Sequence, residues 1–454
     1  MSTAIENIRT IPTRAWLSTV VFIDSVLVAS LFIFRPPLGV LGLISLTAIV
    51  FLAFSQVGLV ATLCLISHIN SLNGEEFQAL RALRWLIMAG MAWITVARYL
   101  AERRRLTIRL GSSEKALLGF IAWGFFCSLF AVNQLASFLA VLRICTFLLV
   151  YIVTRETIAS RGHVRLIMFL LLFVVLSSSV YSFSGMAAGQ YARFSGFLLN
   201  PNSFGILLNF CIPVLLVAFL SYRHVVVRVL FGSGILLGSA ALLLSWSRAS
   251  WLAMLGFVIT FLLLEKKRKL LCVLSSVALV AIVLLALSTD VYSDFAMLMR
   301  LDAGTTRRTT LWHYALQAAV REPVVGYGYD VQRGVVRGES ALTDLHEISV
   351  FREEGRDYDP HNFYLLTLLT TGIPGAILIL LVYYYLFKSQ VNGRRKARRS
   401  SHRLMHTAVF ATLVGCLLNS MFESGGIIGS GSSANYLWLM LGLTAAVTEK
   451  DIEL

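Results

Sequence analysis

The chain has 454 residues, of which 57% are hydrophobic and 14% charged, and its mean hydropathy is +0.77. A soluble chain carries roughly 25% charged residues, so this composition excludes a soluble globular protein. The formal net charge is +15, but the basic residues gather in short segments between apolar runs. That pattern is typical of cytoplasmic loops and argues against a surface that binds nucleic acid.

Apolar runs that are long enough to cross a bilayer recur along the chain, and we predict about 12–14 transmembrane helices. The run at about 15–34 lacks a small-residue cleavage site and indicates a retained helix. Two short runs within 38–70 leave almost no loop, so the helix number is open there. The candidate spans lie at about 15–34, 38–54, 56–70, 84–100, 115–132, 137–154, 164–184, 203–221, 228–245, 249–264, 270–289, 362–387, 405–421 and 432–448. The predicted fold class is an all-α polytopic membrane protein.

Charge divides the chain into three regions. Residues 1–289 form a predicted N-terminal bundle of about 9–11 helices, and 362–454 supply about three more. Between them, 290–361 hold half of the chain's 24 acidic residues and no lysine, whereas the basic segment 388–403 has no acid. By the positive-inside rule, the basic segments face the cytoplasm. We therefore expect 290–361 to be one large loop on the opposite side, the periplasm of a Gram-negative cell.

Within that loop, the spacing of Leu311, Trp312, Ala315 and Leu316 predicts an amphipathic helix at about 306–321. Thr306 is a candidate N-cap, and a segment with Pro323 and glycines follows the helix. We expect this helix to lie on the membrane surface and to cover a cavity.

Three polar motifs open predicted spans on that same side. In "QYARFSGFLLNPNSFG", Arg193 precedes an Asn200 N-cap and a Pro201 at the first helical position. In "SWSRASW", Arg248 stands at the start of a span. In "DPHN", Asp359 is the predicted N-cap, and this places His361 at the second helical position.

These helix starts favour an anionic ligand. Free N–H groups and the positive end of the helix dipole point outward, and Arg193 and Arg248 add charge. Arginine binds phosphate through two parallel hydrogen bonds, so a diphosphate-linked lipid fits. The same environment should lower the pKa of His361, which would leave a neutral imidazole that can act as a general base.

Simpler interpretations remain open for each residue. Arg248 can extend to the membrane interface, Arg193 can be a solvated loop residue, and His361 can be an ordinary interfacial histidine. Tyr327 suits an interfacial aromatic belt as well as a ligand contact. Glu423 can bind an acceptor sugar or face water.

All six cysteines lie within apolar runs and show no CxxC spacing. They indicate buried packing residues, not a disulfide framework or a metal site. We expect no cofactor.

Four motifs taken together, in this order and topology, resemble the O-antigen ligase/polymerase superfamily of bacterial envelope glycosyltransferases. They are "RFSGFLLNPNSFG", "SWSRASW", "RTTLWHYALQAAVREPVVGYGYD" and "HNFYLLTLLTTGIPGAIL". The resemblance covers about 190–385. It implies a metal-independent, inverting transfer of a glycan from undecaprenyl diphosphate to an acceptor sugar hydroxyl at the periplasmic face of the inner membrane.

The resemblance also implies roles for the residues. His361 would activate the acceptor hydroxyl, while Arg193 and Arg248 would hold the diphosphate. The further candidates for substrate contact are Arg308, Asn202, Asn362, Tyr327 and Glu423.

The acceptor is left open by the resemblance. A ligase transfers the glycan to the lipid A core, a polymerase transfers it to another lipid-linked repeat, and a protein oligosaccharyltransferase transfers it to protein. The sequence favours the ligase, with an O-antigen or exopolysaccharide polymerase as the alternative. A transporter of lipid-linked sugars would also need cationic residues at membrane depth. However, the chain lacks the paired interrupted spans of an inverted repeat.

Overall fold

The computed structural model describes residues 110–131, 133–187, 193–198, 200–270, 306–329, 359–429 and 433–454. This part of the chain is helical and contains no strand. The predicted spans before residue 110, nearly all of the span at 270–289 and the acid-rich stretch 330–358 lie outside the described residues. The helices are α6 (Ser112–Ser128), α7 (Gln134–Thr157), α8 (Arg161–Ala187), the short 3-10 helix η2 (Gly196–Leu198), α9 (Pro201–Ser221), α10 (Val225–Leu244), α11 (Arg248–Leu264), α14 (Thr306–Arg321), α17 (Phe363–Lys396), α18 (Ser400–Ser420) and α19 (Ala434–Glu449).

The all-α membrane fold is confirmed. Five described helices (α7, α8, α9, α10 and α17) are long and apolar enough to cross a bilayer, and α11 is a shorter apolar helix. Their lengths of 20 to 34 residues match the thickness of the hydrocarbon core. The chain is therefore a multi-pass membrane protein.

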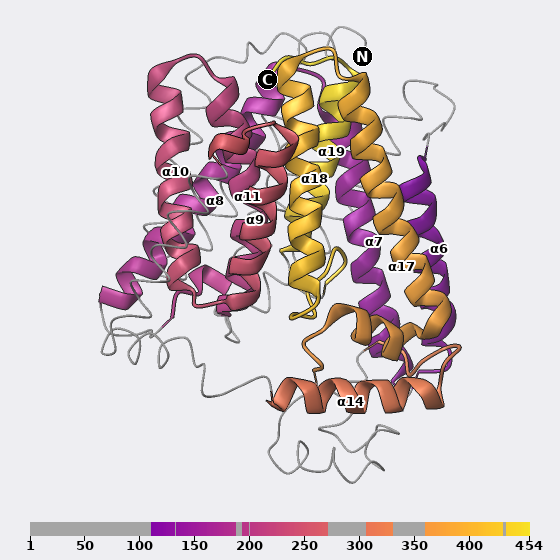
Figure 1. Ribbon diagram of the computed structural model, residues 1–454. Coiled ribbons are helices and arrows are strands. Elements are labelled where there is room, and N and C mark those ends of the chain that lie inside the picture. Colours follow the sequence, from indigo (N-terminus) through magenta and orange to yellow (C-terminus); the bar gives the residue numbers. More distant parts are fainter. Residues whose placement is uncertain are drawn as a thin grey trace, which may run out of the picture.

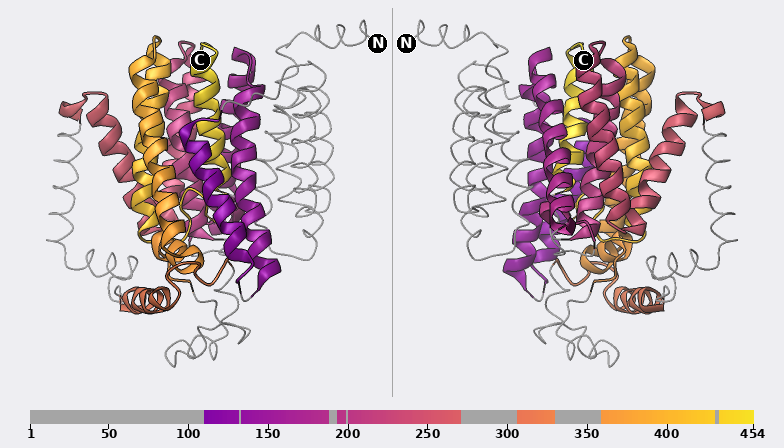
Figure 2. Two further views of the ribbon diagram at one scale, coloured as in Figure 1. Left: turned by 90° about the vertical axis from the view of Figure 1, so that its right-hand side faces the viewer. Right: turned by 90° about the vertical axis from the view of Figure 1, so that its left-hand side faces the viewer.

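The apolar helices stand side by side, and α14 lies across one end of them (Figures 1 and 2). Helices α9, α11 and α17 all begin at this end, which we call the α14 end. The opposite end, where the chain's C-terminus lies, carries the basic segments that join α7 to α8, α9 to α10 and α17 to α18. We call it the basic end. The three polar motifs thus share one end, away from the basic segments.

Helix α17 is broken near its first third. Gly372 has φ +66°, a left-handed conformation that favours glycine, and Pro374 follows without an N–H. A Cβ on Gly372 would lie 2.1 Å from the carbonyl oxygen of Val324, so a larger residue does not fit. The break separates a short helix at 363–371 from the remaining membrane span.

The turn that follows α14 pairs with the backbone groups freed by this break. The N–H groups of Tyr327 and Gly328 donate to the carbonyls of Leu369 and Thr370, at 2.9 and 3.0 Å. From α6, the Trp123 indole donates to the Thr371 carbonyl at 2.8 Å. Because unpaired backbone groups are costly in lipid, these donors stabilise the break and fix α14 against the short helix.

Candidate functional site

The α9 start has the predicted geometry. The Asn200 side chain accepts from the N–H groups of Asn202 and Ser203, at 2.9 and 3.3 Å, and Pro201 is the first helical residue. Asn202 therefore lies on the first turn of α9, at the α14 end, where its side chain reaches Glu423.

The α17 start corrects the sequence prediction. The N-cap is Asn362, not Asp359, because the Asn362 side chain accepts from the N–H groups of Tyr364 and Leu365, both at 3.0 Å. His361 therefore precedes the helix instead of standing at its second position. The Asn362 amide also donates to the Met421 carbonyl at 3.0 Å, which ties the start of α17 to the end of α18.

His361 is held in a tight turn. Its φ is +47°, a conformation that non-glycine residues adopt rarely. The Asp359 carboxylate accepts from the His361 N–H at 2.8 Å and also from the Ser424 hydroxyl. Such left-handed residues cost of order 1–3 kcal/mol and are frequent at functional sites. The turn places the imidazole outside the helix, 42% exposed.

Glu423 is the centre of the polar cluster. It is 7% exposed, and its two carboxylate oxygens face different partners. One oxygen accepts from the Asn202 amide at 2.8 Å and lies 3.4 Å from the Arg308 guanidinium. The other lies 3.7 Å from Nδ1 of His361. We define His361, Glu423, Arg308 and Asn202 as the polar cluster; all four are candidates predicted from the sequence.

Helix α14 contributes Arg308 to this cluster and makes a second contact beside it. The Arg308 guanidinium donates to the Phe422 carbonyl at 2.8 Å, in addition to its contact with Glu423. One turn later, the Trp312 indole donates to the Pro360 carbonyl at 2.8 Å. The amphipathic helix therefore bridges the segment before α17 and the segment after α18.

The pKa of His361 is raised, and the expected lowering is wrong. Its side-chain interaction with Glu423 is the largest cause; burial opposes it, and the charges of Asp359 and Glu423 raise the pKa further. The Arg308 charge lowers it by a smaller amount. At 3.7 Å the His361–Glu423 pair is an ionic contact longer than a direct hydrogen bond. Glu423 stabilises the imidazolium, so this histidine is a stronger base than an isolated one.

Arg193 and Arg248 both belong to the surroundings of the turn between α10 and α11. The Arg193 guanidinium donates to the carbonyls of Ser245 and Trp246, at 3.1 and 3.0 Å. These carbonyl groups follow the last turn of α10. A cation there also interacts favourably with the negative end of the helix dipole. Arg248 begins α11 with its side chain exposed. Arg193 thus shapes the turn from which Arg248 projects.

Helix α9 joins this turn to the polar cluster. Asn202, on its first turn, contacts Glu423, and Gly205 packs one turn further against Ser250 of α11. A Cβ on Gly205 would lie 2.3 Å from the Ser250 hydroxyl, so the two helices approach closely. The Arg193–Arg248 turn and the polar cluster therefore flank the same helix start.

Tyr327 lies in the turn after α14. Its hydroxyl donates to the Ala318 carbonyl at 3.2 Å, and its backbone pairs with α17 as described above. The ring is buried and holds α14 against the short helix.

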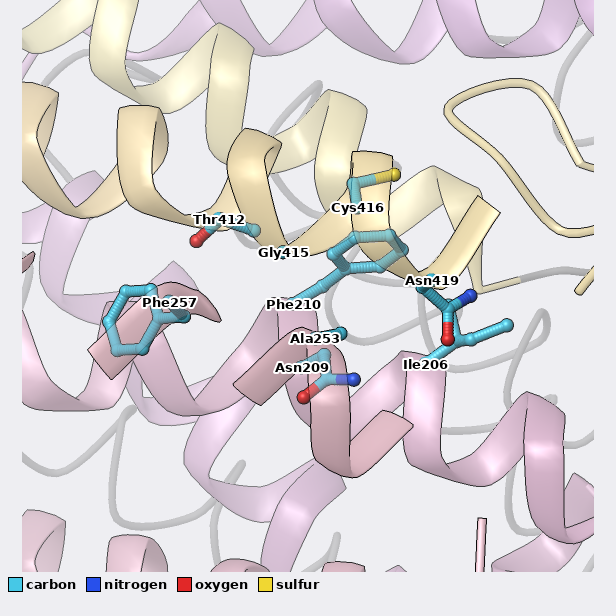
Figure 3. Close-up of a pocket in the computed structure, with 9 residues that line it drawn as sticks. All are labelled: Ile206, Asn209, Phe210, Ala253, Phe257, Thr412, Gly415, Cys416 and Asn419. Atoms are coloured by element: carbon cyan, nitrogen blue, oxygen red, sulfur yellow. The ribbon is translucent and has the colours of Figure 1, made fainter. Parts of the chain in front are cut away.

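Two cavities lie near these residues. The smaller one, about 10 Å³, is enclosed between α9, α11 and α18 and lined by residues such as Asn209 and Asn419 (Figure 3). It is too small for a substrate. The larger one, about 490 Å³, is open to the surroundings. It lies between α14, the start of α17 and the end of α18. We call it the α14 groove; its walls include Trp312, Leu316 and Leu365.

Ser424, Asp359 and Trp312 were not predicted as parts of the site. Asp359 was interpreted as a helix cap, and Trp312 as one residue of an apolar face. The motif "FESGG" after α18 was the available signal, because a buried acid that follows a membrane span usually has a partner. The motif does not identify which residues those partners are.

Fold and site together define a multi-pass helical membrane protein with a histidine–carboxylate–guanidinium cluster at one end, covered by an amphipathic helix. A family model described as O-antigen ligase matches residues 233–380, which include Arg248, Arg308 and His361. This match supports the assignment of the chain to the O-antigen ligase superfamily, whose members are glycosyltransferases of the ligase/polymerase type that act on lipid-linked glycans. No curated protein matches the chain.

Proposed function

We propose that the protein is an O-antigen ligase that transfers a glycan from undecaprenyl diphosphate to a sugar hydroxyl of the lipid A core. The reaction would take place at the periplasmic face of the inner membrane. The observation that supports this most directly is the contact between His361 and the buried carboxylate of Glu423, within a cluster that also holds Arg308.

In this mechanism His361 is the general base. Because Nδ1 faces Glu423, Nε2 is the nitrogen that remains for the acceptor hydroxyl. The acceptor oxygen attacks the anomeric carbon while its proton passes to Nε2. The bond between that carbon and the phosphate oxygen breaks, and undecaprenyl diphosphate leaves with the electron pair. Glu423 stabilises the imidazolium that forms, as the carboxylate does in other histidine–carboxylate pairs.

The arginines would stabilise the leaving diphosphate. Negative charge grows on the phosphate oxygen as the glycosidic bond breaks, and guanidinium groups fixed in advance lower the energy of that state. Arg248 projects from a helix N-terminus, where the backbone N–H groups add to the attraction. Arg308 lies within the polar cluster itself, beside the proposed base.

The first test is His361→Ala. If His361 is the base, the variant should lose transfer by about 10²–10⁴-fold while the purified protein still binds the undecaprenyl-diphosphate glycan. Both quantities are measured on the same preparation. Turnover close to that of the wild type would refute the assignment of the base.

A second variant, Arg248→Lys, tests the phosphate contact. Lysine keeps the charge but cannot form two parallel hydrogen bonds with a phosphate. We expect impaired transfer in a complementation assay. Full complementation would contradict a bidentate role.

The acceptor is tested by deleting the gene. A ligase predicts loss of long chains from lipid A while the lipid-linked polymer is intact. Accumulation of single lipid-linked repeats would identify a polymerase instead.

A further inference from the structure

Two basic runs meet at the basic end of the molecule. One run, residues 266–269, directly follows α11, and the other, residues 395–403, joins α17 to α18. Arg394 connects them, because its guanidinium donates to the Leu264 carbonyl at 2.7 Å and lies 3.7 Å from the Glu265 carboxylate. Arg394 and Leu264 are 130 positions apart in the chain, so the runs become neighbours only in the folded protein.

We define the cationic surface as the exposed basic residues of both runs that lack an acidic partner within the described part of the chain. They are Lys266, Lys267, Arg268, Lys269, Arg395, Lys396, Arg398 and Arg403.

The acids at this end pair with other residues. Glu265 accepts from the Thr407 hydroxyl at 2.8 Å and lies beside Arg394. The acids at the end of α19 and just after it bind other arginines, at 2.8 to 3.2 Å: Glu449 pairs with Arg155, Asp451 with Arg399, and Glu453 with Arg161. The positive charge of the cationic surface is therefore available to an external anion.

Exposed leucines lie on both sides of the first run. Leu263, on the last turn of α11, is 49% exposed, and Leu270, directly after Lys269, is 48% exposed. Because α11 is an apolar helix, an exposed leucine at its end is in contact with hydrocarbon. On α17, two turns before the second run, Lys388 lies 5.5 Å from the centre of the Tyr384 ring, a pair typical of the membrane interface. The cationic surface thus stands at the level of the lipid headgroups.

An anionic phospholipid matches both features of this surface. Its phosphate accepts hydrogen bonds from lysine and arginine, and its acyl chains can cover the neighbouring leucines. The leucines favour a lipid over an acidic soluble protein, because a soluble partner does not reach side chains that face the bilayer.

We propose that the cationic surface binds the phosphate groups of anionic phospholipids in the leaflet at the basic end. A phosphate held there fixes the depth of α11, whose other end carries Arg248. Lipid binding at this end does not depend on the reaction proposed at the α14 end.

Lipid retention tests the proposal. Full-length protein is placed in nanodiscs with equal parts of phosphatidylglycerol and phosphatidylcholine that have the same acyl chains, and native mass spectrometry counts the lipids that stay bound. We expect the wild-type protein to retain phosphatidylglycerol at least about tenfold more often, because each nearby cation strengthens the attraction about fivefold. Lys267→Gln/Arg398→Gln removes one cation from each run and should lower this preference at least about fivefold.

Arg161→Gln/Arg399→Gln is the matched control. It removes the same charge from the same end, and the two arginine side chains are 43% and 42% exposed, but both are already paired with acids. Its lipid preference should stay within about twofold of the wild type. An equal fall in the two double variants would show that net charge alone attracts the lipid. No fall in Lys267→Gln/Arg398→Gln would likewise overturn the proposal.

Two competitors identify the class of ligand. Glycerophosphoglycerol, the phosphatidylglycerol headgroup without acyl chains, should not displace the lipid at millimolar concentration; displacement would point to a site for a soluble phosphate. Polyglutamate represents an acidic protein and should not displace the lipid either. Polyglutamate binding that is lost in Lys267→Gln/Arg398→Gln, with the lipid preference unchanged, would assign the cationic surface to a protein partner.

Discussion

At the scale of single residues, Glu423 determines the chemistry of the polar cluster. A carboxylate that is 7% exposed needs partners, because an unpaired buried charge is strongly unfavourable. Asn202, Arg308 and His361 supply them from three separate segments of the chain. The carboxylate therefore positions these side chains as well as tuning the histidine.

Glu423→Gln should alter the pH dependence of transfer. The pKa of His361 is raised. If His361 is the base, as proposed, it becomes protonated and the rate falls as the pH drops through that raised value. Gln removes the main cause of the raised pKa, so the acid limb of the pH–rate profile should move to lower pH. The plateau rate should also fall, by about 10²–10⁴-fold, because the imidazolium loses its counter-charge. An acid limb that does not move would show that Glu423 does not tune the base.

Substitutions of Asp359 test whether the left-handed turn at His361 is needed for transfer activity. Asp359→Ala removes the acceptor of the His361 N–H, and we expect a lower kcat with little change in KM, because the imidazole is misplaced. Asp359→Asn keeps an acceptor oxygen at the same place and should retain most of the activity. Equal losses in the two variants would indicate that the charge, and not the turn, is what counts.

At the scale of elements, the break in α17 positions the site. The short helix 363–371 begins directly after its N-cap Asn362, and His361 precedes that cap. The turn after α14 is hydrogen-bonded across the break. Glycines at both sides of this contact allow backbones to meet where a side chain would collide.

Gly372→Ala should destabilise the protein. The new Cβ would lie 2.1 Å from the Val324 carbonyl oxygen, and φ +66° is itself unfavourable for alanine. We expect a loss of at least about 1–3 kcal/mol in stability, seen as a lower melting temperature in detergent. Gly119→Ala on α6 is the control, because its nearest neighbour would be 3.5 Å away. Equal melting temperatures for the two variants would show that the break tolerates a side chain.

Local patterns predicted the helices well and the contacts between them poorly. The Asn200 cap and the Pro201 helix start could be predicted because they depend only on neighbouring residues, and the structure confirms both. At the start of α17, two candidate caps stand three residues apart, and the sequence could not tell which one faces the helix. The error in the pKa of His361 has a different cause: Glu423 is distant in sequence, and its contact with His361 arises only when α17 and α18 pack together.

At the scale of the whole molecule, the two ends differ in charge and in content. The basic end carries the arginine- and lysine-rich segments, and the α14 end carries the polar cluster. From the positive-inside rule we propose that the α14 end faces away from the cytoplasm.

This orientation can be measured by labelling thiols in right-side-out spheroplasts. A membrane-impermeant maleimide should label Val320→Cys at the α14 end, whereas Arg398→Cys at the basic end should react only after permeabilisation. The wild-type protein gives the background; Cys127, Cys211 and Cys416 are buried. Labelling of Arg398→Cys in sealed spheroplasts would reverse the orientation.

The junction between the α14 turn and the broken helix also has a consequence for biogenesis. The turn at 323–329 is synthesised before α17, so its N–H groups gain their partners only once the later helix has been inserted. Glu423 is made later still, after α18. A ribosome-bound chain that ends before α18 therefore lacks the counter-charge of His361, and the site becomes complete only when the penultimate described helix has packed. If His361 and Glu423 act together as proposed, a growing chain cannot act on lipid-linked sugars until its insertion is nearly finished.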